Sequence, residues 1–516
     1  MIFKERSLPV TYIAEPKLGF AYDQSTDHPK DGLTLYGPPS GTPRPNITIG
    51  VIGTSRGIGF FKRWAEALRA PVPVPPPSKY EKKTRLHLTD FPGLEEGFGL
   101  RTDPDNFVEY VIKDSAIDSA LTILNHHEAV AATVDLYVDW VERHGRNEEQ
   151  SVDVWVFVVR EDIFQHCRSQ SRRAGMKLVQ GEFSKKQTAR TDVPLLPGML
   201  DETLEEVFDD IPDFHRQVKA RLLKLGQTSQ IVRETTLAPD QFVNSAGQPK
   251  RGTQDAASIA WNFATGLYYK TQPEPPWKIA HMRPGVCYVG LVFKLIPNHP
   301  QNHACCAAQM FLSEGDGVVF RGANGPWMTE NKEFHLQGAA AMRMIETVLD
   351  TYKSRFGEYP KELFIHGKTT FSNGEWEAFR AAAPSETNVI GVRIKPTYGE
   401  MKLFRDGDYP CIRGTALILD PQNAYLWTSG YLPRLDTYVG PETPNPLHIT
   451  ILRSTSDLPD MDEVLRDIMG LTKINYNACN YSDGRPVTIR FAEKVGDVLV
   501  MGSAQGAERQ PFKFYI

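Results

Sequence analysis

Five polar residues between positions 215 and 270 have the types and spacing that suit a phosphate monoester. The set comprises His215, Lys219, Gln230, Asn262 and Lys270. A terminal phosphate carries about two negative charges, which call for several charge-assisted donors. Two ammonium groups, two amides and an imidazole can supply them. The alternative from spacing alone is that these side chains are solvated helix faces, since most Lys and Gln residues are exposed.

The first two of these residues belong to a predicted helix. The segment from Asp213 to Gly226 has a capping residue at its start, a glycine stop at its end and apolar residues every three or four positions. His215 and Lys219 are four residues apart, so both side chains leave the same face. The segment Thr228–Val232 then reads as a short strand that carries Gln230.

A second helix is predicted over Ala256–Lys270. Asn262, Gly266 and Lys270 recur at intervals of four, so they form one stripe with the glycine in the middle. A glycine in that place allows another backbone or a phosphate to approach closely. If these two helices and the strand converge, their polar side chains would bind a terminal phosphate.

The order of predicted strands and helices indicates an α/β protein in two parts. A run of prolines and a glutamate, Pro273–Pro276, separates residues 1–280 from residues 281–516. Each part alternates buried apolar runs with amphipathic helices, which is typical of α/β folds. The clearest predicted strands are Ile47–Gly53, Val152–Val159, Val286–Phe293, Cys305–Leu312, Glu362–His366, Asn388–Ile394 and Thr415–Leu419, with a helix over Gly338–Tyr352.

The composition is that of a globular protein without a membrane span. The chain has 516 residues, of which 41% are hydrophobic, 23% are charged and six are cysteines. No apolar run reaches the roughly 18 residues of a membrane helix, and the first residues do not resemble a secretory signal. We therefore expect a cytoplasmic protein with no membrane partner.

The net charge of −5 argues against a uniformly basic nucleic-acid binder. The charge is patterned, however. An acidic run over residues 201–213 precedes a helix that carries Arg216, Lys219, Arg221 and Lys224. A basic cleft in an acidic body therefore remains open.

One glycine-rich turn suggests a different class of protein. Gly53–Gly59 follows a predicted strand and resembles a dinucleotide-binding turn, and Tyr398 with Lys402 resembles a dehydrogenase Tyr-x-x-x-Lys pair. In such dehydrogenases the turn and the pair lie in one domain, whereas here about 340 residues separate them. We interpret Gly53–Gly59 as a structural turn and keep an NAD(P)-dependent oxidoreductase as an alternative.

The phosphate-binding set resembles the 5′-phosphate pocket of the Argonaute MID domain. That pocket pairs a Tyr or His with a Lys one helical turn later, followed by a Gln and a further Lys, as His215, Lys219, Gln230 and Lys270 do here. Longer ordered segments resemble the short prokaryotic Argonautes. These segments are Asp31–Pro38, Gly285–Leu291, Ala304–Leu312, Glu362–His366, Pro444–Leu447 and Pro486–Ala492.

The resemblance implies the fold and the sites. Residues 1–280 would hold an N-terminal segment and a Rossmann-like MID domain, and residues 281–516 an RNase H-like PIWI domain, with no room for N and PAZ domains. The C-terminal carboxylate of Ile516, with Gln230, would hold Mg²⁺ against the guide phosphate. Val292 and Lys368 occupy two positions where cleaving relatives carry Asp, so the PIWI site is expected to be inactive. Glu375 and Glu377 are expected to be isolated and solvated.

The resemblance also implies a function as a guide-directed sensor in prokaryotic immunity. The ligands would be a small guide RNA with a 5′-phosphate and a complementary single-stranded DNA target from a plasmid or phage. The partner would be an APAZ-domain effector protein in a heterodimer. The motifs look closest to the group with a TIR effector, which would deplete NAD and kill the cell; a sirtuin-type NADase or a nuclease is the alternative. An active guide-directed endonuclease is a further alternative.

Overall fold

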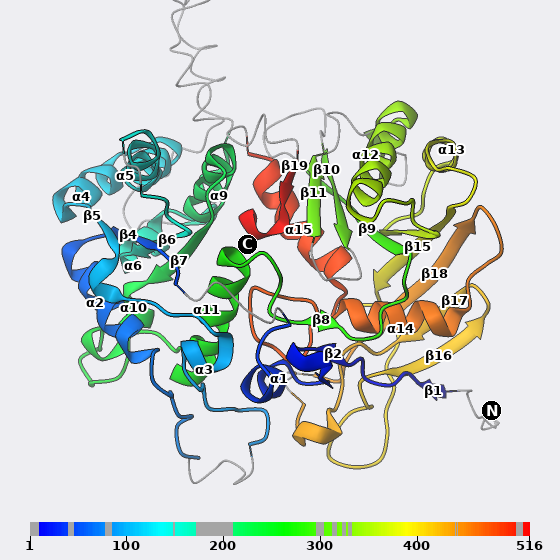
Figure 1. The fold of residues 1–516 in the computed structure, drawn as a ribbon, viewed down its shortest axis with the longest axis horizontal. Helices are drawn as coiled ribbons and strands as arrows, with labels where there is room; N and C mark the ends of the chain where they lie inside the picture. Colours follow the sequence, from blue (N-terminus) through cyan, green and yellow to red (C-terminus); the bar gives the residue numbers. More distant parts are fainter. Residues whose placement is uncertain are drawn as a thin grey trace, which may run out of the picture.

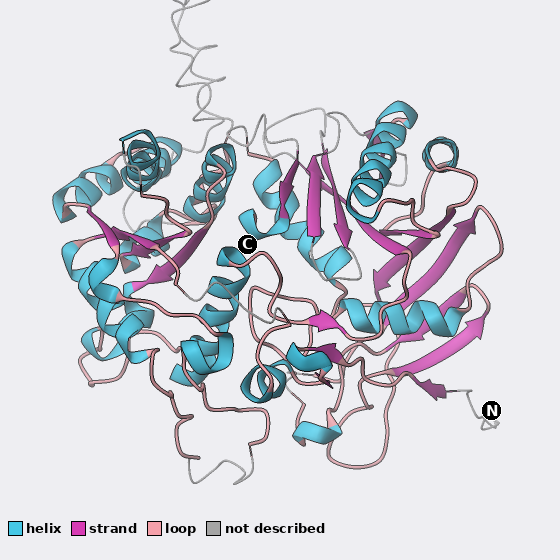
Figure 2. Ribbon diagram, in the orientation of Figure 1, coloured by secondary structure: helices cyan, strands magenta, loops and turns pink. Residues whose placement is uncertain are grey.

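The computed structural model describes two lobes, each built around a β-sheet (Figure 1). The residues described are 10–39, 46–77, 85–147, 150–171, 210–295, 304–311, 317–321, 327–328, 333–438, 440, 442–501 and 509–516. Most of the acidic run over residues 201–213 lies outside them. Helices cover both faces of each sheet, so the predicted α/β class is confirmed (Figure 2).

The first lobe contains a four-stranded parallel sheet in the order β5-β4-β6-β7. All six residues of the central strand β6 are buried, as expected for a parallel sheet covered on both faces. Val154, Val156 and Val158 face the core that includes α2 and α11, whereas Trp155, Phe157 and Val159 face α5 and α9. The strands are β4 (Ile49–Gly53), β5 (Val108–Val111), β6 (Val154–Val159) and β7 (Ser229–Arg233). The helices are α2 (Ser55–Ala67), α3 (Leu94–Phe98), α4 (Asp114–Thr122), α5 (His126–Asn147), α6 (Glu161–His166), α9 (Phe214–Leu225), α10 (Glu234–Leu237) and α11 (Ala256–Thr271).

The second lobe contains a ten-stranded mixed sheet in the order β1-β16-β17-β18-β15-β14-β9-β10-β11-β19. The strands β9, β10 and β11 form an antiparallel meander, and β14 lies parallel to both β9 and β15. This arrangement is the RNase H-like sheet that the resemblance implies. The strands are β1 (Val10–Tyr12), β9 (Val286–Leu295), β10 (Ala304–Phe311), β11 (Gly317–Arg321), β14 (Glu362–Gly367), β15 (Asn388–Pro396), β16 (Thr415–Asp420), β17 (Asn423–Leu426), β18 (Leu447–Ser454) and β19 (Arg509–Pro511).

Four helices pack on the second sheet. Those on one face are α12 (Gly338–Phe356) and α13 (Asn373–Ala382), and those on the other are α14 (Met461–Leu471) and α15 (Val487–Leu499). Smaller elements are α1 (Pro29–Leu35), β2 (Leu18–Gly19), β3 (Ser25–Thr26), β8 (Lys278–Ile279), β12 (Trp327–Met328) and β13 (Phe334–His335).

The start of α15 approaches β9 very closely at Gly290. A Cβ atom at Gly290 would lie 1.9 Å from the carbonyl oxygen of Thr488, so only glycine fits there. Thr488 also places its Oγ1 2.9 Å from Nδ1 of His366, on the neighbouring strand β14. These two contacts fix α15 against the middle of the sheet, between the two lobes (Figure 1).

The N-terminal segment joins the second lobe rather than only the first. Strand β1 pairs with β16 at the edge of the large sheet. Glu15 accepts hydrogen bonds from Arg413 Nε at 3.0 Å and from Lys473 Nζ at 2.8 Å, in a buried cluster. One hydrophobic core runs through both lobes. Residue 280 therefore does not mark a break in packing.

Among the described residues, no helix is both long and apolar enough to cross a membrane.

Candidate functional site

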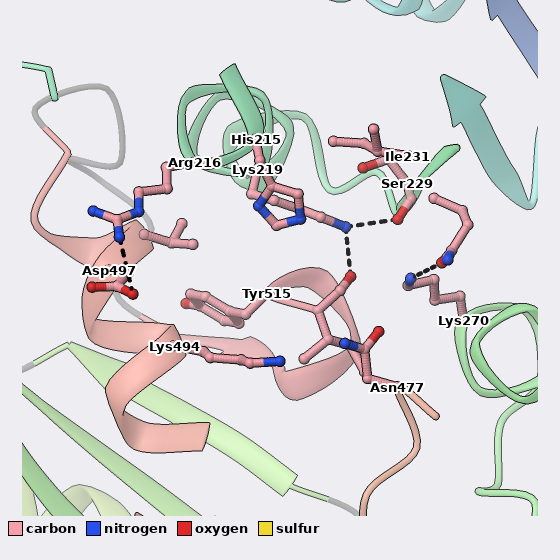
Figure 3. Close-up of a pocket in the computed structure, with 13 residues that line it drawn as sticks. His215, Arg216, Lys219, Ser229, Ile231, Lys270, Asn477, Lys494, Asp497 and Tyr515 are labelled. Carbon is pink, nitrogen blue, oxygen red and sulfur yellow. Dashed lines mark hydrogen bonds and ion pairs between the residues drawn. The ribbon is translucent and has the colours of Figure 1, made fainter. Parts of the chain in front are cut away.

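A pocket of about 470 Å³ lies where the first lobe meets the C-terminal segment (Figure 3). Its walls come from α9, the start of β7, the end of α11, α15 and the last residues of the chain. The lining residues are His215, Arg216, Lys219, Ser229, Gln230, Ile231, Lys270, Asn477, Lys494, Asp497, Val498, Tyr515 and Ile516. The structure thus brings together His215, Lys219, Gln230, Lys270 and Ile516, as the resemblance implies.

Lys219 is buried at the base of this pocket. The predicted helix boundaries are confirmed, because Asp213 caps α9 through a hydrogen bond to the Arg216 amide and Gly226 ends it in the left-handed conformation. Lys219 Nζ donates to the carbonyl oxygen of Ser229 at 2.6 Å and to the Ile516 oxygen at 2.5 Å. Burial, and then the charge of Lys270, hold the Lys219 pKa well below its usual range.

Lys270 reaches the same pocket from α11. Its ammonium donates to Oε1 of Gln230, and burial lowers the Lys270 pKa to about 7. Gly266 makes room for this contact, because a Cβ there would lie 3.3 Å from Gln230 Oε1. The group that approaches the glycine is therefore the Gln230 side chain.

The charges that line the pocket are unbalanced in favour of cations. Arg216, Lys219, Lys270 and Lys494 contribute positive charge, and Asp497 is the one acidic side chain in the lining. Asp497 is already shared between Arg216 at 3.4 Å and Lys294 at 2.9 Å. Lys219 contacts the Ser229 carbonyl and an oxygen of the C-terminal residue Ile516, and Lys270 contacts the neutral Gln230 amide. Four cationic side chains therefore face Asp497 and one terminal carboxylate, an excess of positive charge that suits the pocket to an anion.

His215 and Asn262 differ in their placement. His215 lines the pocket and is exposed as a whole residue, and desolvation of its imidazole, followed by the charges of Lys219 and Lys270, lowers its pKa. Asn262 does not line the pocket. Its Oδ1 accepts from the Cys479 amide at 2.9 Å and its Nδ2 donates to Gln254 at 3.0 Å. Its position one helical turn from Gly266 places it beside the C-terminal lobe instead.

The two oxygens expected to hold Mg²⁺ both face the pocket. Gln230 Oε1 and the Ile516 oxygen are hard oxygen ligands of the type that magnesium prefers. Each accepts a hydrogen bond from a lysine, Lys270 and Lys219 respectively. A phosphate that draws these two ammonium groups to itself would free both oxygens, so the donor set fits a cation that arrives with the phosphate.

Val292 and Lys368 lie side by side in the second lobe. Val292 is in β9, and Lys368 directly follows the adjacent strand β14. Both line a cavity of about 270 Å³, where Lys368 forms an ion pair with Glu493 of α15. Among the described residues, no group of three or more His, Cys, Asp or Glu residues is arranged to hold a metal ion.

One sequence expectation about carboxylates in this lobe needs correction, and one carboxylate of the lobe was not predicted. Glu375 is buried rather than solvated; it caps α13 and lies 2.7 Å from Nδ1 of His335. The carboxylate beside Lys368 is Glu493, which the sequence analysis did not single out. The sequence pattern that could have revealed Glu493 is its spacing. Glu493 and Asp497 are four residues apart, as are Arg490 and Lys494, so the helix presents an acidic and a basic stripe next to each other.

A carboxylate from another element faces the glycine-rich turn after β4, in the place where a dinucleotide-binding turn would contact a pyrophosphate. Buried Glu234 accepts a hydrogen bond from Thr54 Oγ1 at 3.0 Å and pairs with Arg56 at 3.0 Å. A Cβ at Gly57 would lie 3.0 Å from Glu234 Oε1. The turn therefore contacts a carboxylate of the protein itself, which supports the interpretation of Gly53–Gly59 as a structural turn.

Comparisons with solved structures show similarity over nearly the whole chain. The Argonaute from Clostridium butyricum bound to a guide DNA and a 19-mer target DNA matches with a TM-score of 0.60 and 16% identity, over 99% of this chain and 55% of that one. Drosophila Piwi matches with a TM-score of 0.57 and 12% identity, over 98% and 56%. Aa-Ago with externally bound siRNA matches with a TM-score of 0.53 and 14% identity, over 99% and 57%.

The chain spans a little over half the length of these three proteins. No protein-family model and no curated protein matches it. The structural similarity confirms the fold that the sequence predicts: the chain has the fold shared by Argonaute and Piwi structures, with a Rossmann-like MID lobe followed by an RNase H-like PIWI lobe.

Proposed function

We propose that this protein anchors the 5′-phosphate of a guide RNA in the pocket of Lys219 and Lys270. The observation that carries the proposal is the pair of buried ammonium groups. In the part of the chain that the structure describes, Lys219 contacts the Ser229 carbonyl and the C-terminal residue Ile516, and Lys270 contacts the Gln230 amide, so two lysines face one terminal carboxylate. Burying a lysine is costly unless an anion compensates it. A phosphate monoester provides that compensation and several acceptor oxygens in one group.

The guide would then direct recognition of a complementary single-stranded DNA. The Clostridium butyricum structure of the same fold holds a guide strand and a target strand together. In this division of labour, base pairing reads the sequence and the protein holds the guide and the duplex by their backbones. The guide is a small RNA and the target is plasmid or phage DNA in the function that we propose.

The PIWI lobe is proposed to hold the duplex without cutting it. Two-metal hydrolysis needs carboxylates that place both ions on the scissile phosphate. Val292 is apolar and Lys368 is cationic at the two positions that the resemblance assigns to such carboxylates. The catalytic step would belong to a partner that carries an APAZ domain, with a TIR NADase as the preferred effector and a sirtuin-type NADase or a nuclease as the others.

The anchoring step is tested by the affinity of the chain for guide RNAs that differ at one group. Fluorescence anisotropy with a 5′-phosphorylated RNA and the same RNA carrying a 5′-hydroxyl should show tighter binding of the phosphorylated strand. Equal affinities would contradict the proposal.

The sensor role is tested separately, with the chain purified together with its genomic neighbour. Adding guide RNA and complementary single-stranded DNA should trigger NAD loss, or nuclease activity if the effector is a nuclease. A scrambled target is the control. A complex that binds guide and target but shows neither activity would contradict the sensor–effector role.

A further inference from the structure

Three adjoining cavities form a continuous surface from the phosphate pocket to Lys368. A cavity of about 450 Å³ shares Lys494 and Asp497 with the phosphate pocket. The same cavity shares Lys294 and Glu493 with the 270 Å³ cavity that contains Lys368. All four shared side chains come from α15 or from the neighbouring strand β9, so one helix borders the whole path.

Cations outnumber anions along this path. Besides Lys219 and Lys270 in the phosphate pocket, the basic side chains are Arg216, Lys294, Lys368, Arg485, Arg490 and Lys494. The acidic side chains that pair with them are Asp483, Glu493 and Asp497. Glu493 contacts both Lys368 and Arg485, Asp497 contacts both Arg216 and Lys294, and Asp483 contacts Arg490. Five of these six cations therefore pair with three carboxylates, which leaves an excess of positive charge for a polyanion.

Lys368 lies at the far end of this path in an unusually apolar setting. Five of the residues that line its cavity are Leu291, Val292, Phe293, Phe334 and Phe371. Its side chain is one-third exposed, and burial, followed by the charges of Arg485 and Lys294, lowers its pKa to about 8. An ammonium group in this setting is stabilised by a further anion at the open side of the cavity.

We propose that Lys368 binds a backbone phosphate of the nucleic acid whose 5′ end occupies the pocket of Lys219 and Lys270. The inference rests on the proposed function and adds a second phosphate site beside the middle of α15, where Lys368 contacts Glu493. In the free protein Glu493 pairs with Lys368. When the phosphate arrives, Lys368 Nζ donates to a phosphate oxygen, and Arg485, 3.3 Å from Glu493, continues to pair with that carboxylate.

This site would hold a phosphodiester and leave it intact. The same place in the fold would need carboxylates to bring metal ions onto the phosphate. Val292 supplies none, and the Lys368 charge repels a cation and attracts the phosphate instead. With a lysine at this position, the site would bind a phosphate electrostatically without hydrolysing it.

The test uses guide–target duplexes in which one phosphate of the guide strand at a time is replaced by an uncharged methylphosphonate. In the wild-type protein, replacement at one linkage should weaken binding about 3- to 10-fold, the range of a partly exposed charged hydrogen bond. In Lys368→Met, overall affinity should fall by a similar factor, and that linkage should no longer matter. The slope of log affinity against log salt should also fall by about one.

Two further variants keep the test independent of folding. Lys361→Met changes an exposed lysine at the opposite end of β14 and should leave the methylphosphonate profile unchanged. Glu493→Gln removes the internal competitor of the phosphate and should tighten binding, which a merely damaged protein would not do.

A Lys368→Met profile identical to that of the wild type, with the same sensitive linkages, would overturn the inference. The preference for a 5′-phosphate is measured with the same proteins. If that preference persists while Lys368 has no effect, the anchoring proposal survives and the second site falls. If the preference is absent in the wild type, the anchoring proposal itself falls.

Discussion

Lys219 Nζ lies 2.5 Å from the Ile516 oxygen, although the two residues are 297 positions apart in the sequence. The contact completes the pocket from the C-terminal side, where Tyr515 and Val498 also line it. A ligand in this pocket therefore binds only the conformation in which the two lobes are joined. By linkage, such a ligand should stabilise the joined state.

Removal of divalent cations tests the proposed role of Ile516 and Gln230. If Mg²⁺ bridges these oxygens and the guide phosphate, EDTA should weaken binding of 5′-phosphorylated RNA several-fold and leave 5′-hydroxyl RNA nearly unchanged. Anisotropy titrations with and without Mg²⁺ measure the difference.

The matched variant extends the chain by two glycines after Ile516, which moves the terminal carboxylate away from the pocket. Its affinity for the phosphorylated strand should be low and insensitive to EDTA. If wild type binds equally well with and without EDTA, the lysines suffice and magnesium has no place in the pocket.

Target cleavage by the isolated chain should be absent. Guide-loaded protein incubated with labelled target and Mg²⁺ or Mn²⁺ should leave the target intact, because Val292 and Lys368 offer no oxygen ligands. Denaturing gels read the outcome. A single cut at a fixed distance from the guide end would show an active endonuclease and contradict this account of the PIWI lobe.

Replacing Gly266 by alanine should leave the thermal stability of the protein intact and weaken its binding of the 5′-phosphorylated guide. Alanine favours an α-helix by about 1 kcal/mol relative to glycine, so the Tm of Gly266→Ala should not fall. The new methyl group would press on Gln230, only 3.3 Å away, and disturb its contact with Lys270. Affinity for the 5′-phosphorylated strand should drop several-fold. An unchanged affinity would mean that Gln230 takes no part in the site.

The Glu15 cluster should contribute strongly to stability in a pH-dependent way. Burial raises the Glu15 pKa, but Arg413 and Lys473 outweigh it and bring the pKa below its ordinary value of 4.5. The contribution is therefore complete above pH 4.5 and is lost as the pH falls through the folded-state pKa. Glu15→Gln should lower the free energy of unfolding by about 3 kcal/mol at pH 7, since two buried cations lose their partner.

Urea denaturation at several pH values checks this prediction. The gap between wild type and Glu15→Gln should narrow below pH 4.5. A gap that stays constant down to pH 3 would show that the charge of Glu15 is not what stabilises the N-terminal segment.

The local part of the site could be predicted from the sequence, and its long-range part could not. The caps at Asp213 and Gly226 predict the bounds of α9, Phe214–Leu225, and the four-residue spacing of His215 and Lys219 predicts its polar face. Lys494 and Asp497 could not be assigned to the site from the sequence, because no local sequence pattern shows that α15 packs beside α9. Asn262 shares the helix stripe of Lys270, but two turns of helix carry it out of the pocket and toward Cys479.

The strands also show that local features could be predicted from the sequence and long-range pairings could not. The complete burial of β6 follows from its unbroken apolar sequence, and its predicted position is confirmed. The pairing of β1 with β16 joins residues about 400 positions apart, and three residues carry too little pattern to reveal it. The burial of Glu375 depends on His335, which reaches it from another element.

The central claim, that Lys219 serves a 5′-phosphate, is tested most directly by a two-by-two comparison of proteins and guides. Wild type and Lys219→Met are titrated with the 5′-phosphorylated RNA and with its 5′-hydroxyl counterpart, and Lys224→Met provides an exposed control on the same helix. Loss of a charged hydrogen bond predicts about a 10- to 100-fold weaker affinity for the phosphorylated strand alone. Equal losses for both strands would show that Lys219 supports the fold or another part of the ligand, and would contradict the claim.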